Sequence, residues 1–154
     1  MITKALAILL TTAVLLVQDA GGPPGPTTAT GTIDVRFGHA DVYMDAGPEA
    51  LAAYQCEIKA TAGDVTLVGI EGGEHAAFNQ PPYYDPKALG QQRIILGAFN
   101  TGADLPRGRT RVARLMVRIA GPTRPAYSGT VQVAASPDGK PIAATISVSE
   151  GAEQ

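Results

Sequence analysis

The chain has 154 residues, with 12 Lys and Arg against 14 Asp and Glu and a formal net charge of −2. That length holds one domain, and the near-balance of charge speaks against nucleic acid as a partner. The charges are unevenly spread, because acids dominate from Asp34 to Asp85 and bases dominate from Lys87 to Arg124. Strands of one sandwich interleave, so we expect these two sets to meet in cross-strand ion pairs.

The first 31 residues predict export and a spacer. Lys4 precedes the apolar run Ala5 to Val17, which is shorter than the roughly 20 residues that a membrane-spanning helix needs. This is typical of a secretory signal peptide, so we expect residues 1–20 to be removed and the protein to be secreted, or to reside in the periplasm or cell envelope, without membrane contact. Residues 21–31 (GGPPGPTTATG) predict a Gly/Pro-rich linker. The globular domain is then expected at 32–149, with 150–154 as a short tail.

The stretch Leu51 to Gly73 predicts two strands joined by a short polar turn. Alternate residues of the first strand fall on opposite faces, which is typical of a sheet that is buried on one side. One face carries Ala52, Tyr54, Cys56, Ile58 and Ala60, and the other carries Leu51, Ala53, Gln55, Glu57 and Lys59. Cys56 is the only cysteine, so no disulfide forms within the chain and we expect the thiol to pack as a small hydrophobe.

The other segments are also strand-sized. We expect strands at 33–37, 42–44, 93–100, 109–119, 131–135 and 142–148. The first two are expected to be separated by a break at Gly38. In the strand at 109–119, Val112 is expected on the same face as Arg114. The apolar run at 93–100 predicts a strand covered on both faces, and Ser136 to Gly139 predicts a hairpin turn between its neighbours. The prolines from Pro81 to Pro86 exclude a central strand there, and Asp85 is expected to cap a helical turn. Together these features predict an all-β fold, an antiparallel two-sheet β-sandwich of jelly-roll or immunoglobulin-like type with about eight to nine strands.

Three segments resemble a cohesin domain. They are Ala53 to Gly73, with the pattern V-x-x-x-G-I-x-x-G in its second strand, then Arg93 to Phe99, and last Gly108 to Ile119. Cohesins are jelly-roll-like sandwiches that bind dockerins, small calcium-loop modules, through an exposed sheet face, and several carbohydrate-binding modules are their relatives. The resemblance implies a protein partner of the dockerin type and contacts at Gln55, Glu57, Ala98 and Asn100.

No pattern in the sequence predicts catalysis. His39 and His75 are the only histidines and neither has a second ligand at metal spacing, and no G-x-S-x-G elbow is present. We therefore expect a protein that is not an enzyme and that carries no cofactor. Calcium contact at Asp41 with Asp45, or at Glu71 with Glu74, stays open.

Two further surfaces are candidates for binding. Tyr83 and Tyr84 stand on a proline-stiffened loop and either stack on a ligand or fold back to cap one end of the sandwich. Arg111, Arg114 and Arg118 form a basic stripe around Met116, which is either a solvated face or a site.

The leading hypothesis is a secreted non-catalytic module that docks a protein partner through the Gln55 and Glu57 face. The alternatives are a carbohydrate-binding module that acts in polysaccharide binding or degradation through Tyr83 and Tyr84, and a structural module of the cell envelope.

Overall fold

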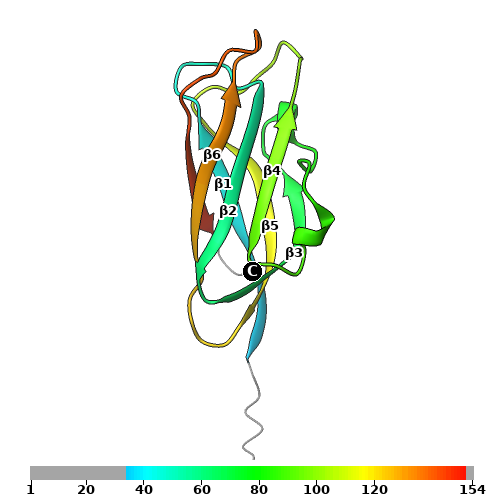
Figure 1. Ribbon diagram of the computed structural model, residues 1–154, viewed down its shortest axis with the longest axis vertical. Helices are drawn as coiled ribbons and strands as arrows, with labels where there is room; N and C mark the ends of the chain where they lie inside the picture. The colour runs from blue at the N-terminus through cyan, green and yellow to red at the C-terminus, as the bar shows by residue number, and fades with distance from the viewer. Residues whose placement is uncertain (1–33, 152–154) are drawn as a thin grey trace, which may run out of the picture. The chain divides into compact units, whose positions relative to one another are not determined.

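The computed structural model describes residues 34–151, and Figure 1 draws them as a sandwich of strands. The predicted signal peptide and linker lie outside the described residues. The strands are β1 (Val35–Asp45), β2 (Ala53–Ala62), β3 (Asp64–Gly72), β4 (Arg93–Phe99), β5 (Arg109–Ala120), β6 (Ala126–Ala135) and β7 (Thr145–Glu150). Two single-turn 3-10 helices, η1 (Ala76–Phe78) and η2 (Pro86–Ala88), lie between β3 and β4. No helix within residues 34–151 is long and apolar enough to cross a membrane.

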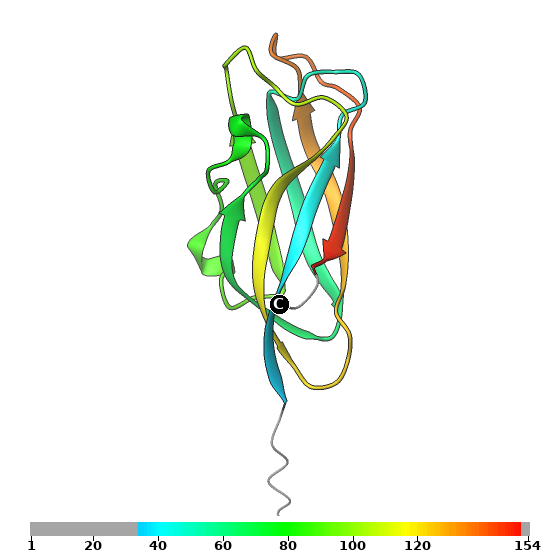
Figure 2. The same ribbon diagram turned by 180° about the vertical axis from the view of Figure 1, so that it is seen from behind.

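The seven strands form two antiparallel sheets, and this confirms the predicted all-β sandwich. One sheet has the order β3-β5-β1-β7 and is seen from its own side in Figure 2, and the other has the order β4-β2-β6. Seven strands are fewer than predicted, because the expected break at Gly38 does not occur. Gly38 is paired with Val117 in the middle of β1, so the two strands expected at 33–37 and 42–44 are one.

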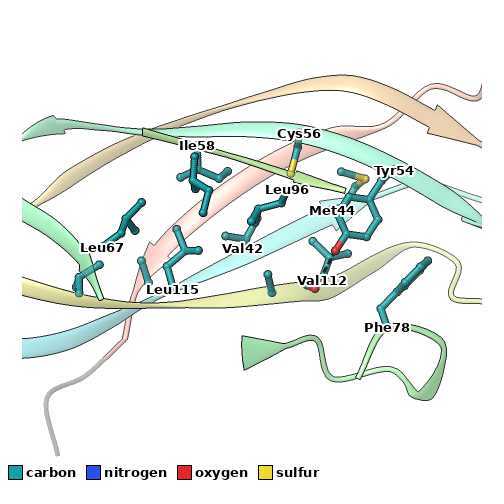
Figure 3. Packing of buried hydrophobic residues seen from close by; sticks show 14 of the residues in the cluster. Val42, Met44, Tyr54, Cys56, Ile58, Leu67, Phe78, Leu96, Val112 and Leu115 are labelled. Carbon is teal, nitrogen blue, oxygen red and sulfur yellow. Dashed lines mark hydrogen bonds between the residues drawn. The ribbon is translucent and has the colours of Figure 1, made fainter. Parts of the chain in front are cut away.

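The core lies between the sheets and confirms the predicted inner face of β2. Tyr54, Cys56 and Ile58 point across to residues of the facing sheet (Figure 3), and all three are buried. The Tyr54 hydroxyl donates a hydrogen bond of 3.1 Å to the carbonyl of Val112 on β5. Leu51, expected on the outer face, is buried, because it precedes β2 and its N–H donates to the carbonyl of Pro106.

A bulge in β5 overturns the predicted position of Val112. Val42 of β1 lies opposite Ala113 and Tyr43 lies opposite Arg111, so Val112 has no residue of β1 opposite it. An extra residue shifts the alternation of a strand by one place. Val112 and Ala113 are consequently both buried, whereas the alternation of the sequence had placed Val112 outside with Arg114.

The predicted closing hairpin is present at its tip and in the first residues of its arms. Gly139 takes the left-handed conformation with φ of 76°, and the Ser136 N–H donates to the Lys140 carbonyl at 2.9 Å. Pro141 bridges Ala135 and the Ile142 N–H donates to the Ala134 carbonyl at 3.0 Å, so the pairing with β6 continues past the tip to Ile142. The chain then crosses to the other sheet, where β7 pairs with β1.

The strand β4 was expected to be covered on both faces, and this is wrong. It is an edge strand of its sheet, with Ile94 and Leu96 buried and Phe99 exposed. The apolar run in its sequence therefore supplies one buried face and one exposed face. This arrangement positions the candidate site.

Candidate binding surface

The outer face of the β4-β2-β6 sheet carries the polar positions that the sequence predicts for binding. Gln55 and Glu57 point outward from β2, as expected. Opposite residues of antiparallel strands share a face, so Gly97 opposite Gln55 and Ile95 opposite Glu57 also point outward. Val133 of β6 flanks Gln55 on the other side.

Gly97 brings together two surfaces that were separate in the sequence. It lies opposite Gln55 within the sheet, and on its free edge it forms an antiparallel bridge with Tyr83 of the proline-rich loop. The Tyr83 N–H donates to the Gly97 carbonyl at 2.7 Å, and the Gly97 N–H donates back at 2.9 Å. Tyr83 of the loop therefore pairs with the edge of the sheet and lies across Gly97 from Gln55, while Tyr84 packs back against the core cluster.

A shallow depression of about 280 Å³ lies on this face. Its lining consists of Ala53, Tyr54, Gln55, Tyr83, Gly97, Ala98, Phe99 and Val133. Because Gly97 has no side chain, its backbone forms part of the floor. A Cβ atom built at Gly97 would come no closer than 3.6 Å to the Tyr54 carbonyl oxygen, so the fold itself does not demand glycine there.

Three large apolar side chains stand exposed around the depression. Tyr83 is 76% exposed, Phe99 69% and Val133 48%. We call these residues the apolar patch. Scattered single apolar residues are ordinary on a protein surface, whereas a group of them around one depression is a candidate interaction site.

Polar side chains border the apolar patch. The Gln55 Nε2 donates to the Oε1 of Gln132 at 2.7 Å, and Glu57 forms an exposed ion pair of 2.5 Å with Arg93. The hydrogen bond from Arg93 and the positive charges of Arg93 and Lys59 hold the pKa of Glu57 below its usual value. The border is therefore hydrogen-bonded and almost neutral in charge.

The side chains of two of the four predicted contact residues do not point outward on this face. Ala98 lies opposite the inward-facing Tyr54 and packs against the core. The Asn100 side chain donates to the Ala77 carbonyl at 3.0 Å and accepts from the Gly102 N–H at 2.7 Å, so it holds two loops in place. Ala98 and Asn100, which were expected to be exposed, are each half-buried.

Phe99 is the residue that the sequence reasoning missed. The prediction had the alternation of β4 out of phase by one residue, because nothing in the run RIILGAF distinguishes its two faces. The signal that could have found Phe99 is the pairing of β2 with β4, which sets Ala53 opposite Phe99.

The proline-rich loop behaves partly as predicted. Asp85 does cap a helical turn, and its Oδ1 accepts the Lys87 N–H at 2.9 Å. Tyr84 is half-buried and packs against the core cluster. Of the two tyrosines, only Tyr83 is available on the surface as a ligand contact.

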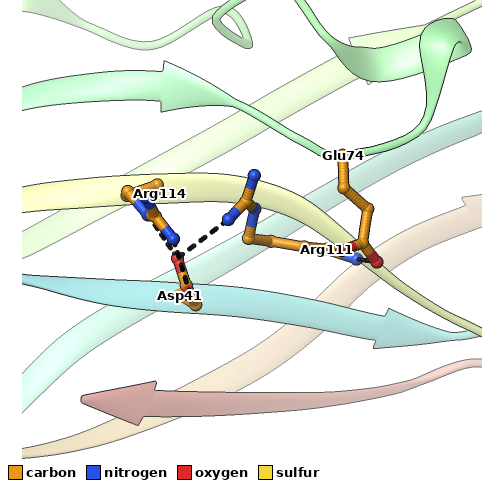
Figure 4. A network of polar contacts seen from close by, with 4 residues as sticks. All are labelled: Asp41, Glu74, Arg111 and Arg114. Carbon is orange, nitrogen blue, oxygen red and sulfur yellow. Dashed lines mark hydrogen bonds and ion pairs between the residues drawn. The ribbon is translucent and has the colours of Figure 1, made fainter. Parts of the chain in front are cut away.

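The three arginines of the predicted basic stripe lie on β5 of the other sheet and do not form one group. Arg111 and Arg114 both approach Asp41 of β1 (Figure 4), at 3.6 Å and 2.7 Å. Arg118 lies further along β5, opposite Phe37. This confirms the expected cross-strand ion pairs between the acidic and basic parts of the chain, and it gives Asp41 two structural partners.

The surroundings of His75 and Cys56 give both residues a role in the fold. The Nδ1 of His75 accepts the Ala77 N–H at 3.2 Å and so caps η1. Burial raises the pKa of the Cys56 thiol to about 12, which makes it a poor nucleophile. Within residues 34–151, no three His, Cys, Asp or Glu side chains gather in a way that could hold a metal ion.

Comparison of the chain with protein-family models, curated proteins and solved structures finds no match. The resemblance to cohesin therefore stays a prediction. The apolar patch is the most distinctive part of the surface of the described residues.

Proposed function

We propose that the protein is a non-catalytic binding module that docks a protein partner through the outer face of the β4-β2-β6 sheet. The exposed pair Tyr83 and Phe99, which line one depression together with Gln55, carries this proposal. Aromatic side chains at the centre of an interface supply much of its binding energy, and polar residues form the usual rim around such a centre. The location that we propose is outside the cell or in its envelope.

The chemistry of the depression favours a polypeptide. Its lining is mainly apolar, and the two amides at its border, Gln55 and Gln132, already bond to each other. The nearest charges, Glu57 and Arg93, are paired. A surface of this kind matches an apolar and weakly charged partner face. Given the cohesin-like sequence pattern, we propose that this partner is similar to a dockerin.

Binding of the full-length protein to a panel of dockerin modules, measured on an immobilised surface, tests the proposal. We expect at least one binder, whose affinity falls about tenfold or more when Phe99→Ser and Tyr83→Ser are combined. Phe37→Ser is the matched control, since Phe37 is 67% exposed and lies on the other sheet. A binder that is indifferent to the double variant, or that responds equally to Phe37→Ser, would contradict the proposed face.

A carbohydrate ligand is the second candidate, and the observation that favours it is that the exposed Tyr83 and the Gln55 side chain line the same depression. An exposed ring can stack on a sugar while an amide bonds its hydroxyl groups. A glycan array separates the two candidates. Sugar binding that is lost in Tyr83→Ala would support this function, whereas no signal on any glycan would exclude it from the range tested.

A further inference from the structure

The free edge of β4 carries backbone groups that have no backbone partner within residues 34–151. In an antiparallel strand, alternate residues direct their N–H and C=O groups to the same edge. Gly97 bonds to Tyr83 on the side away from β2, so Ile95 and Arg93 direct their groups to that same side. The residues on either side of β4 support this phase, since Gln92 and Asn100 bond instead to Ala60 and Ala52 of the β2 segment.

The chain itself leaves this edge after one bridge. Continuing the antiparallel register of Tyr83 and Gly97 would set Asp85 opposite Ile95. Asp85 instead caps η2, and Pro86 begins that turn. Figure 1 shows the segment between β3 and β4 running alongside β4. Within residues 34–151, no backbone group bonds to Ile95 or Arg93 on this side.

A groove occupies the place that the departing chain leaves open. It has a volume of about 360 Å³ and is lined by Asp85, Lys87, Ala88 and Gln91 on one side and by Arg93 to Ile95 on the other. That volume falls within the range of about 300–1,000 Å³ that is typical of ligand sites. In binding by strand addition, a peptide bonds to unpaired backbone groups at the edge of a sheet, and its alternate side chains enter pockets beside that edge.

We propose that this edge receives an extended segment of the polypeptide partner as an added antiparallel strand, in line with Tyr83. The added strand would bond to the N–H and C=O groups of Ile95 and Arg93, and its alternate side chains would enter the groove. A second copy of this chain fits less well, because Tyr83 already occupies the edge at Gly97 and would obstruct a symmetric β4-to-β4 pairing.

This inference rests on the proposed function. Two edge residues allow only a few backbone hydrogen bonds, whereas a stable interface buries about 1,000 Å² or more. The partner must therefore also cover the apolar patch, which is continuous with this edge because Ile95 and Gly97 stand on the same outer face as Gln55 and Glu57.

A phage-displayed library of random peptides, selected on the full-length protein, supplies the probe. We expect selected peptides to shift the amide resonances of Ile95 and Arg93 and to slow their hydrogen exchange. N-methylation of every second peptide residue, on the bonding edge, should weaken binding about tenfold or more, while methylation of the intervening residues should not. No selected peptide, shifts elsewhere on the chain, or equal tolerance of both methylation patterns would overturn the inference, as would a β4-to-β4 dimer.

Variants of Ile95 distinguish the contribution of its backbone N–H to peptide binding from that of its side chain. Ile95→Pro removes the edge N–H and should abolish peptide binding, whereas Ile95→Thr keeps that N–H and should retain binding. If Ile95→Pro fails to fold, the exchange rates in the unaltered protein decide the question. Peptide binding that is lost with Phe99→Ser but not with Ile95→Pro would overturn strand addition and leave the proposed face intact. Edge pairing that is indifferent to the apolar patch would instead contradict the proposed face.

Discussion

Arg114 of β5 holds Asp41 of β1 through two hydrogen bonds, from Nε to Oδ1 at 2.7 Å and from Nη2 to Oδ2 at 3.1 Å. The side chains are only 11% exposed for Asp41 and 28% for Arg114. Arg111 approaches the same Oδ1, so one largely buried carboxylate serves two guanidinium groups. This pair joins the two central strands of the four-stranded sheet.

We predict that Asp41→Asn lowers the free energy of unfolding by about 1–3 kcal/mol, because it replaces the carboxylate that two arginines share with a neutral amide that has one acceptor oxygen instead of two. Chemical denaturation at neutral pH measures the change. Arg118→Gln is the control, and it should alter the free energy by no more than about 0.5 kcal/mol, as is usual for surface substitutions. Equal effects of the two variants would show that the ion pair contributes no stability.

The same ion pair predicts a dependence of stability on acid. Burial raises the pKa of Asp41, but the hydrogen bond and charge of Arg114, with the charges of Arg111 and His39, outweigh burial and lower it below 3.8. The unfolded chain then binds a proton more readily than the folded protein. The contribution of Asp41 is complete above its unfolded pKa and is lost as the pH falls from about 5 through the folded pKa. The stabilities of the unaltered protein and Asp41→Asn should therefore converge in acid, and a constant difference down to about pH 2 would contradict this.

Cys56 should resist thiol reagents in the folded protein. It is fully buried, and burial raises the pKa of its thiol to about 12, so little thiolate exists at about pH 8. We expect negligible reaction in native buffer, and complete reaction in denaturant, with an aromatic disulfide reagent that releases a coloured thiolate when it reacts with a thiol. A native reaction as fast as the denatured one would contradict the burial of Cys56.

Substitution by alanine should change the stability of the protein to different extents at two glycines. A Cβ atom at Gly73 would lie 2.2 Å from the carbonyl oxygen of Arg111, a backbone atom that cannot give way, whereas at Gly97 the nearest atom is 3.6 Å away. We predict that Gly73→Ala costs about 1–3 kcal/mol of stability through overpacking and that Gly97→Ala changes it by less than about 1 kcal/mol. Thermal unfolding of both variants measures the difference, and similar losses would contradict the prediction.

Two phenylalanines should separate stability from binding. Phe78 is buried and packs edge-on against Tyr54, with ring centroids 5.3 Å apart, so Phe78→Ala should cost about 3–5 kcal/mol. Phe99 is exposed, and Phe99→Ala should change stability by no more than about 0.5 kcal/mol. Denaturant unfolding of the two variants provides the comparison. A large loss in Phe99→Ala would mean that Phe99 supports the fold and is not free for a partner.

Local alternation in the sequence determined the class of fold and much of the central strand. The rule that adjacent residues of a strand face opposite sides needs no knowledge of the partners. It therefore placed Tyr54, Cys56 and Ile58 in the core and Gln55 and Glu57 outside. The proline content also excluded a central strand at 81–86, and the tip of the closing hairpin followed from its turn residues.

Only the tertiary structure decided how these strands meet. The phase of a strand is lost at a bulge and cannot be carried from one strand to the next, so Val112 was assigned to the wrong face and Ala98 was chosen where Phe99 is exposed. The partner of β7 and the bridge from Tyr83 to Gly97 depend on pairing between segments that are distant in sequence. That pairing sets Tyr83 across Gly97 from Gln55 and leaves the edge of β4 open at Ile95, because the register between strands is fixed by packing and not by local sequence.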